Sequence, residues 1–290
     1  MQPAPLIPLA TGVALIGALL AGNALLALAA PEAGPRVALS MLTGANATTL
    51  SASSGGLSGG ETVTVSGEHL SAVTSVSVGG QDARILDSTN GELMFEVPNA
   101  LDYTPGIVAV TLETDSGALD AALEWEYVVA TAVDRQLEYA FRYWDDYNTV
   151  FFGDFNAWGG DCMNFVSQTL LARGWAPTED WFNLAQEDWA PAFVHVPSFD
   201  EWLSSHPEYG AQRWGLGRID DVKIGDIVVF DWDGDGSLDH AQVVSSTRVV
   251  DGETEVLMVG HNVDSTYRSI DDALEEQGTP KATVHFWSIP

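Results

Sequence analysis

Hydrophobic and polar residues alternate over the segment from residue 55 to 130. Thr62 to Ser66 alternates, and so does Val73 to Val78. Further short apolar runs follow at Leu93 to Val97, Val108 to Leu112 and Leu123 to Val129. Turn residues such as Asn90-Gly91 separate the runs. This pattern predicts short strands that bury one face, so residues 55–130 are expected to form an all-β sandwich.

The period becomes helical after Ala130. Apolar residues recur at three- and four-residue steps at Leu137, Ala140, Phe141 and Trp144. A second helix is predicted from about Asp161 to Arg173, with Gly174 as its stop. An irregular, aromatic-rich stretch, residues 175–218, precedes four predicted strands: Asp226 to Phe230, His240 to Ser246, Glu255 to His261 and Thr283 to Ile289. Residues 131–290 are therefore expected to form an α+β domain with an antiparallel sheet.

The N-terminal segment has the composition of an export signal. Residues 6–30 are nearly all apolar and uncharged, and the run ends in the small-x-small pattern Ala27-Leu28-Ala29. Residues 1–29 are predicted to be a signal peptide, although no Lys or Arg precedes the apolar run. If it stays uncut, a run of roughly 20 residues suffices as a membrane anchor. Residues 30–54 read as a linker, and the protein is expected outside the cell or at its surface.

Charge and cysteine content narrow the possible partners. The chain has 41 Asp and Glu against 11 Lys and Arg, so its surface repels nucleic acid and anionic lipid. A single cysteine rules out an internal disulfide bond. We expect no nucleic-acid partner and a monomeric protein.

The predicted sandwich resembles the IPT/TIG immunoglobulin-like family. The matching stretches are Gly60 to Gly67, Val76 to Gly80, Phe95 to Pro98 and Trp125 to Val128. Families of this kind serve as spacers or binding modules, so the resemblance implies a surface glycan or protein as the ligand of this domain.

Cys162 follows two glycines and Asp161 at the start of the second predicted helix. The glycines allow a tight approach, and Asp161 can cap the helix. A thiol in the first turn feels the positive end of the helix dipole, which favours the thiolate. The free backbone N–H groups there point to where an oxyanion would form. Cys162 is thus a candidate nucleophile, the alternative being a buried cysteine heading an amphipathic helix.

A thiol nucleophile needs a proton acceptor. Of the six histidines, His69 lies in the sandwich, and His195 and His206 lie in the irregular stretch. His240 opens a predicted strand, where it is expected to face the helix packed on the sheet. It is therefore the preferred base.

The segment from about Asp134 onward resembles the putative amidase domain family of the papain-like NlpC/P60 and CHAP group. The motifs are Tyr139-Ala140…Tyr143-Trp144, Gly160-Asp161-Cys162-x-Asn164-Phe165-Val166-Ser167-Gln168, Gly225 to Trp232, Asp239-His240-x-x-Val243-Val244 and Gly260-His261-Asn262-x-Asp264. The resemblance implies a papain-like fold and a Cys–His amidase or peptidase, often acting on cell-wall peptide. Met163 replaces the usual Thr, and the Asn-Pro usual after the first helix is missing, which would alter the groove.

The residues and the resemblance together suggest roles. Cys162 attacks the amide carbonyl, His240 carries the proton, and the Cys162 N–H holds the oxyanion before water cleaves the thioester. His261 is the first choice for a third residue that orients the imidazole, with Asn262 as the alternative. The supporting residues are Asp161, Asn164 and Gln168.

The loop from Asp231 to Asp239 has the spacing of a calcium loop. The candidate ligands are Asp231, Asp233, Asp235, Ser237 and Asp239, with glycine at position six. Gln242 takes the place of the usual twelfth-position Glu, and a strand follows instead of a helix. A structural Ca²⁺ and a solvated acidic turn are the two interpretations. The chemistry itself requires no cofactor.

Five tryptophans lie between the nucleophile and the strands: Trp175, Trp181, Trp189, Trp202 and Trp214. Most are expected to cover the core, and some to line a groove. The leading hypothesis is a secreted cysteine amidase or endopeptidase acting on peptidoglycan or another peptide or amide. The alternatives are a surface-binding protein with an inactive amidase-like domain and a Cys–His acyltransferase.

Overall fold

The computed structural model describes residues 44–290, except residue 186 and residues 278–279. The predicted signal peptide and most of the predicted linker therefore lie outside the described residues. The described residues group into one compact unit. No helix within the described part of the chain has the length and apolarity needed to cross a membrane.

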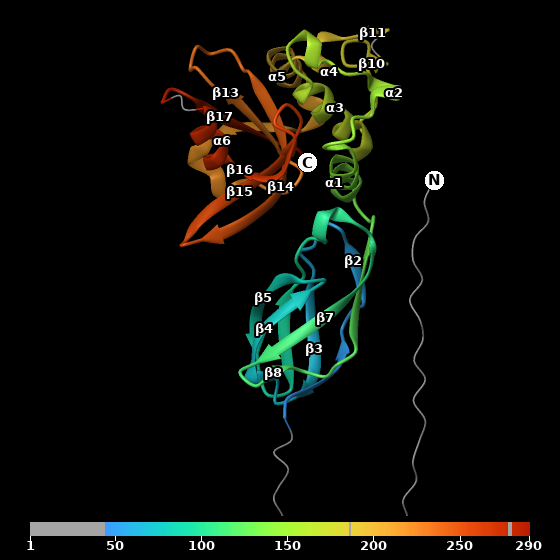
Figure 1. Cartoon of the computed structure of the whole chain (residues 1–290), viewed down its shortest axis with the longest axis vertical. Coiled ribbons are helices and arrows are strands. Elements are labelled where there is room, and N and C mark those ends of the chain that lie inside the picture. The colour runs from blue at the N-terminus through green and yellow to red at the C-terminus, as the bar shows by residue number, and fades with distance from the viewer. Residues whose placement is uncertain (1–43, 186, 278–279) are drawn as a thin grey trace, which may run out of the picture. The chain divides into compact units, whose positions relative to one another are not determined.

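The N-terminal domain is a β-sandwich (Figure 1). Its strands run in the order β1-β3-β6-β5-β4-β7-β9-β2, with β8 paired to β7. They are β1 (Asn46–Leu50), β2 (Ser54–Gly56), β3 (Thr62–Glu68), β4 (Val73–Val78), β5 (Gln81–Ser88), β6 (Glu92–Glu96), β7 (Gly106–Thr114), β8 (Gly117–Ala118) and β9 (Leu123–Val128). Alternate residues such as Val63, Val65, Phe95 and Trp125 are buried, as the sequence pattern predicts.

Two features of the sandwich differ from the sequence-based expectation. Strand β1 lies inside the segment predicted as a linker, because Asn46 to Leu50 pairs with β3 while burying only Ala47. Strand β5 was not predicted because its residues are mostly polar and none is fully buried. Strand β1 lies at one end of the strand order, whereas β5 pairs with both β4 and β6. In both strands the pairing depends on backbone contacts more than on an apolar face.

The second domain begins with helices. They are α1 (Ala132–Tyr143), α2 (Thr149–Phe152), α3 (Cys162–Arg173), α4 (Pro191–Val194), α5 (Val196–Ser205) and the late α6 (Ile270–Gln277). Thr131 and Asp134 form a capping box at the start of α1. Helix α3 is buried along most of its length and ends at Gly174, whose φ of 118° suits glycine. The predicted helix and its stop are confirmed.

An antiparallel sheet completes the domain, in the order β12-β17-β13-β14-β15-β16. Its strands are β12 (Gln212–Gly215), β13 (Ile227–Asp231), β14 (His240–Val250), β15 (Glu253–Gly260), β16 (Ser265–Ser269) and β17 (Thr283–Ser288). A small hairpin joins β10 (Asn183–Leu184) and β11 (Asp188–Trp189), and 3₁₀ turns lie at Leu70–Ala72, Leu101–Tyr103, Asn156–Trp158, Pro207–Tyr209 and Leu216–Asp221. The result is a mixed α/β domain.

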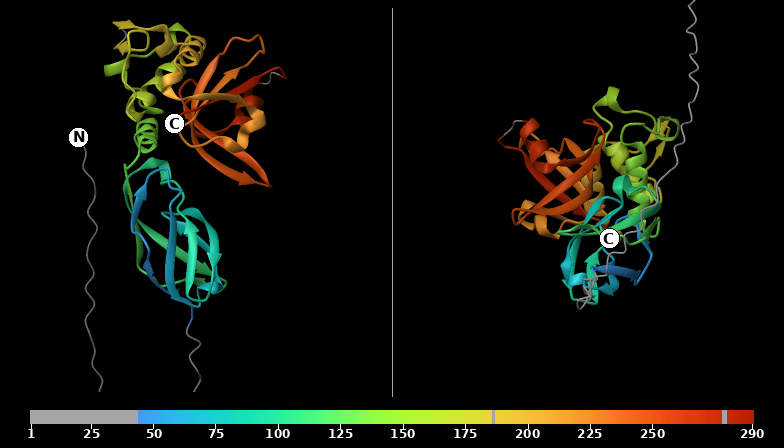
Figure 2. Two further views of the ribbon diagram at one scale, coloured as in Figure 1. Left: turned by 180° about the vertical axis from the view of Figure 1, so that it is seen from behind. Right: turned by 60° about the horizontal axis from the view of Figure 1, so that its bottom comes forward.

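The two faces of this sheet carry different apolar clusters. Ile227, Val229, Ala241 and Val243 belong to the cluster that includes α3 residues. Val228, Phe230, Val244 and Met258 belong to a second cluster that includes Ile270 and Ala273 of α6. Figures 1 and 2 show α1 and α3 beside the sheet, with α6 near β16 and β17. This division decides which side chains of β14 can reach α3.

Candidate active site

Cys162 is the first residue of α3, as predicted. Gly159 and Gly160 precede it with φ values of 116° and 132°, a region that other residues avoid. A Cβ on Gly160 would lie 3.0 Å from Asn262 Oδ1, so the close approach of that side chain also requires glycine. The Cys162 side chain is nearly buried but lines a pocket.

The environment of the thiol favours its neutral form. Burial raises the pKa of Cys162 from 9.0 to about 11. The backbone N–H groups of Ala241 and Met163 oppose this rise in pKa, whereas the charge of Asp161 adds to it. The N–H groups at the start of the helix favour the thiolate, as expected, but desolvation has the larger effect on the pKa of the resting thiol.

This pKa predicts how Cys162 reacts with iodoacetamide. Because the folded thiol is protonated below about pH 11, its alkylation should accelerate with pH up to that value. At pH 8 the native protein should react about 100-fold more slowly than the urea-unfolded chain. A thiol pKa of about 11 instead of 9.0 lowers the fraction of thiolate at this pH by about a hundredfold. Intact-mass measurements over a pH series test this. A rate that levels off below pH 8 would instead mean a thiolate stabilised by a cation.

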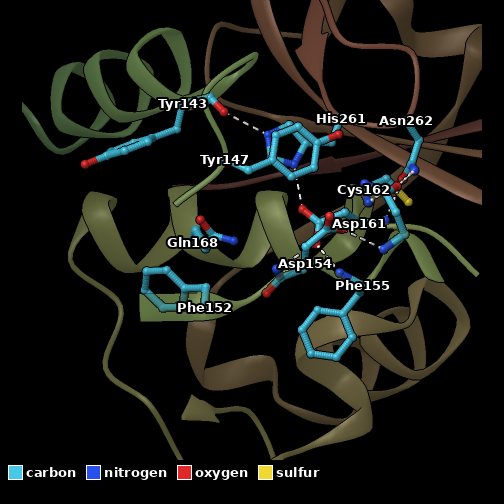
Figure 3. Close-up of polar contacts among 12 residues, drawn as sticks. Tyr143, Tyr147, Phe152, Asp154, Phe155, Asp161, Cys162, Gln168, His261 and Asn262 are labelled. Carbon is cyan, nitrogen blue, oxygen red and sulfur yellow. Dashed lines mark hydrogen bonds and ion pairs between the residues drawn. The ribbon is translucent and has the colours of Figure 1, made fainter. Parts of the chain in front are cut away.

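The first backbone N–H groups of α3 are already hydrogen-bonded. Asn262 Oδ1 accepts from both Asp161 N and Cys162 N, each at 2.7 Å (Figure 3). Asn262 has a φ of 74°, which asparagine adopts more readily than most residues. Its Nδ2 donates to Asn156 Oδ1. The Cys162 N–H, expected to be free for an oxyanion, therefore has an amide oxygen in that place.

Asp161 occupies the N-cap position, but its side chain does not bond a helix N–H. Its Oδ1 accepts from Phe155 N and from Asn164 Nδ2, both at 2.9 Å. Its Oδ2 lies 2.6 Å from His261 Nδ1. The Asp161 side chain therefore does not cap α3, as was expected. Instead, its hydrogen bonds connect the loop before α3, the helix itself and His261, the residue after β15.

Both ring nitrogens and one ring face of His261 contact neighbouring residues. Its Nε2 lies 2.8 Å from the Tyr143 carbonyl oxygen, and its ring stacks on Tyr147 at 3.6 Å between centroids (Figure 3). Both ring nitrogens face acceptors, so the ring can donate to both only as an imidazolium. In that protonated form, the ring and the Asp161 carboxylate make a buried ion pair. With both nitrogens engaged, His261 does not orient His240.

His240 lies on the other face of the sheet from α3. Its partner across the ladder is Phe230, and its ring lies 6.0 Å from Phe230 and 5.8 Å from Trp232. Strand alternation places the following residue, Ala241, in the cluster with Cys162. The expectation that His240 faces the helix is therefore wrong. Between the described residues, no hydrogen bond joins His240 to Cys162.

The imidazole of His240 is in an apolar setting. Burial lowers its pKa to about 4, and nearby Arg268 adds to this effect. Its Nε2 is buried and has no hydrogen-bond partner in the described part of the chain. His240 is therefore neutral at physiological pH.

The two other supporting residues are buried and hydrogen-bonded. Asn164 Oδ1 accepts from Asn183 Nδ2 at 2.9 Å, in addition to the Asn164 bond to Asp161. Gln168 Oε1 accepts from the Tyr139 hydroxyl at 2.7 Å. These bonds give both side chains a packing role within the helix layer.

The pocket beside Cys162 has a volume of about 550 Å³. Phe155, Trp158 and Trp189 line it, together with His195 and Asp239. Trp189 is one of the five tryptophans of which some were expected to line a groove. Trp158 and His195 were missed, since nothing in their sequence spacing links them to the thiol, although Trp158 directly precedes the glycine pair.

The remaining predicted tryptophans pack in the interior. Trp181 and Trp202 are buried, and Trp175 packs against the same cluster. Trp214 packs against the cluster on the α6 side of the sheet. The expectation that most of this group covers the core is confirmed.

The acidic loop between β13 and β14 is partly preorganised. Carboxylate oxygens of Asp231, Asp233 and Asp239 lie within 4.8 Å of one another. Asp231 also accepts backbone N–H groups from Gly234 and Gly236, which fold the loop around it. Asp235 and Ser237 are not part of this group of three.

Comparisons with known proteins divide the chain in the same way. Residues 130–287, more than half of the chain, match the model of the putative amidase domain family, and residues 46–123 match that of the IPT/TIG domain. The uncharacterized protein YhbB of Bacillus subtilis is 25% identical over 114 residues, which span 37% of this chain and 35% of YhbB.

Two solved structures show limited similarity. The extracellular region of plexin A4 matches with 22% identity and a TM-score of 0.28, covering 30% of this chain and 7% of plexin. A glucan-utilization protein of Bacteroides ovatus, SGBP-B in complex with a mixed-linkage heptasaccharide, matches with 11% identity and a TM-score of 0.23. It covers 82% of this chain and 49% of that protein. On the family match, the chain belongs to the putative amidase domain family and carries an IPT/TIG domain ahead of its amidase domain.

Proposed function

We propose that this amidase-family protein is a cysteine-dependent amide hydrolase with Cys162 as its nucleophile. One observation carries the proposal: the only thiol of the chain begins a buried helix and opens into a pocket. Backbone N–H groups of Ala241 and Met163 favour the thiolate form once it is generated. A cysteine kept only for packing needs neither the pocket nor these groups.

The reaction would begin when a substrate carbonyl enters beside the sulfur. Because Asn262 Oδ1 bonds the Cys162 N–H, the carbonyl oxygen must displace this amide to use that donor. Attack of the sulfur, whose proton passes to a base, forms a tetrahedral oxyanion. When this collapses, the C–N bond breaks, the amine leaves with the proton returned by the base, and a thioester remains. Water then attacks the thioester carbonyl, which releases the acid and returns the thiol.

Two histidines are candidates for the proton acceptor. His240 directly precedes Ala241, whose backbone N–H bonds the sulfur of Cys162. To meet the thiol, however, the His240 ring must leave its contacts with Phe230 and Trp232. His195 is exposed, lines the pocket with Cys162, and has its Nδ1 2.8 Å from Ser198 Oγ.

Substitution distinguishes the two bases. If His240 swings into the site, His240→Ala should lower kcat by at least about 100-fold and His195→Ala by less than threefold. The reverse order would assign the proton to His195. The pH profile of kcat, measured on both variants, separates loss of a base from loss of folding. Equal, small effects of both substitutions would contradict histidine-assisted attack.

The proposal also includes the substrate class, cell-wall peptides, and a location outside the cell. A nucleophile-bearing helix packed on an antiparallel sheet is also the plan of papain-like NlpC/P60 enzymes, which supports cell-wall peptides as substrates of an exported protein. The sandwich would then bind a surface glycan or protein. Digestion of purified peptidoglycan, followed by mass analysis of the fragments, tests this. Gain of one water per cleaved amide supports hydrolysis, whereas an added amine or alcohol would indicate acyl transfer.

A surface-binding protein with an inactive amidase-like domain is the main alternative. It predicts that the protein sediments with peptidoglycan but that no fragment is released. The Cys162→Ala protein would then behave as the wild type does in both measurements.

Calcium binding by the acidic loop stays a prediction. Asp231, Asp233 and Asp239 offer hard oxygen ligands of the kind that Ca²⁺ prefers. If the site binds, millimolar Ca²⁺ should raise the Tm of the chelator-treated protein by a few degrees, and Asp233→Asn should remove this rise. A melting temperature that is independent of Ca²⁺ and chelator would favour a solvated acidic turn.

A further inference from the structure

Trp158 is exposed in a way that sets it apart from most tryptophans of the chain. Its exposed fraction is 61%, whereas Trp125, Trp181, Trp202 and Trp287 are buried. A large aromatic side chain that stays in contact with water at a concave site is typical of a binding surface.

The neighbours of Trp158 hold its ring in place. It stacks on Trp189, with the ring centroids 5.2 Å apart and the planes at 21°. Phe155 contacts both indoles edge-on, at 5.4 Å from Trp158 and 5.3 Å from Trp189. A ring fixed in this way loses little conformational entropy when a ligand stacks on it.

This aromatic platform of Phe155, Trp158 and Trp189 lies in the same pocket as the nucleophile. Only Gly159, Gly160 and Asp161 separate Trp158 from Cys162 in the chain. Phe155 N donates to Asp161 Oδ1 and Gly160 N donates to the Phe155 carbonyl, so hydrogen bonds tie the platform to the start of α3. A group that is bonded near the scissile amide can therefore reach the platform while its carbonyl meets the sulfur.

The charge of the pocket restricts which substrate groups can bind beside the scissile amide. Among the described residues that line the pocket, none is Lys or Arg, and Asp239 contributes a carboxylate. The whole chain carries a formal net charge of −30. A substrate carboxylate beside the scissile bond would meet the Asp239 carboxylate and no Lys or Arg, and His195 would offer it a positive charge only when protonated.

We propose, building on the proposed function, that the pocket selects amides whose group beside the scissile bond is uncharged and aromatic or apolar. This group stacks on Trp158, and substrates with a free carboxylate in that position are disfavoured. Peptides whose acidic groups near the bond are amidated or absent would then be the preferred substrates.

The test exploits the single thiol. Native protein is alkylated with iodoacetamide, with N-benzyl iodoacetamide and with iodoacetate, and the second-order rate constants are compared with those for free cysteine. We expect the benzyl reagent to gain at least about tenfold over iodoacetamide in the wild type, an effect of about the size of one stacking contact. We expect Trp158→Ala to remove this gain. For the wild type, we also expect the ratio of the iodoacetate rate to the iodoacetamide rate to be at least about tenfold lower than the same ratio for free cysteine.

Phe151→Ala is the matched control, because Phe151 is also exposed, at 67%, but does not line this pocket. It should leave all rate ratios unchanged. A benzyl gain that persists in Trp158→Ala, or iodoacetate reacting as it does with free cysteine, would overturn the proposal.

A second measurement keeps the proposal testable if the thiol proves unreactive. In the Cys162→Ala protein, the indole N–H signal of Trp158, assigned by its loss in Trp158→Ala, is followed by NMR. It should shift on titration with N-acetylphenylalanine amide and stay in place with N-acetylglutamate. Shifts with both or with neither would contradict the selection. If the wild type cleaves no amide and forms no acyl adduct while the Trp158 signal shifts as expected, the nucleophile is refuted and the pocket assignment stands.

Discussion

Cys162→Ala should abolish amide hydrolysis, with kcat lowered by about 10⁴-fold or more. In the proposed mechanism the thiol forms the covalent bond to the substrate, so no neighbouring group can replace it in the thioester route. The chain has no second cysteine that could substitute for it. Initial rates on a substrate cleaved by the wild type, followed by chromatography of the released amine, give the ratio.

Two controls separate chemistry from folding in this experiment. Cys162→Ser keeps the size of the side chain and should also be inactive, because a serine hydroxyl at this place has a far higher pKa than the thiol. Met163→Leu changes the adjacent buried residue and should retain most of the activity. Residual activity above about 10% in Cys162→Ala would remove the cysteine from the mechanism.

Asp161→Ala should be among the most destabilising single substitutions in the second domain, costing about 3 to 5 kcal/mol in the free energy of unfolding. The carboxylate accepts from Phe155 N and Asn164 Nδ2 and faces the His261 ring. Removing it leaves these donors buried without an acceptor. It also leaves His261 beside a single acceptor, the Tyr143 carbonyl.

The comparison pair for this substitution is Arg218 and Asp221, whose side chains are each 53% exposed. Asp221→Ala should cost less than about 1 kcal/mol, because a solvent-exposed ion pair contributes little. Urea unfolding of the wild type and both variants, followed by tryptophan fluorescence, measures the difference. Equal costs for the buried and the exposed pair would contradict the buried network as a main support of α3.

Local sequence signals were sufficient for the elements that carry strong patterns. Gly174 marks the end of α3, and the alternation of Thr62 to Ser66 marks a sandwich strand. The position of Cys162 in the first helical turn followed from the glycines and Asp161 before it. Strands β5 and β16 lacked such a signal, because their pairing depends on neighbouring strands more than on their own apolar pattern. Helix α6 is short and buries only Ile270 and Ala273, too few residues for a clear helical period.

Contacts between distant segments were harder to predict. Whether His240 faces α3 depends on strand register, and a shift of one residue reverses the face. The small residue next to it, Ala241, takes the place against Cys162. Asn262 bonding to the start of α3 joins residues 100 apart in the chain, and no local pattern reveals which of its two polar atoms points inward.

The protonation state of the thiol could not be predicted from the local sequence, because it depends on the three-dimensional environment. A helix N-terminus favours a thiolate, but burial of Cys162 has the larger effect on its pKa in the resting structure. Substrate binding would have to change this balance, by bringing a histidine to the sulfur and a carbonyl into the place of Asn262 Oδ1.

The most direct test of the account is to trap the thioester. Wild-type protein is mixed with an excess of a cleavable substrate, quenched in acid within the first turnover, and analysed by intact and peptide mass spectrometry. A thioester mechanism predicts an added mass equal to the acyl part of the substrate, on the peptide that contains Cys162 and absent from Cys162→Ser. Product formation with no acyl adduct at any quench time, and with equal rates in Cys162→Ser, would contradict it.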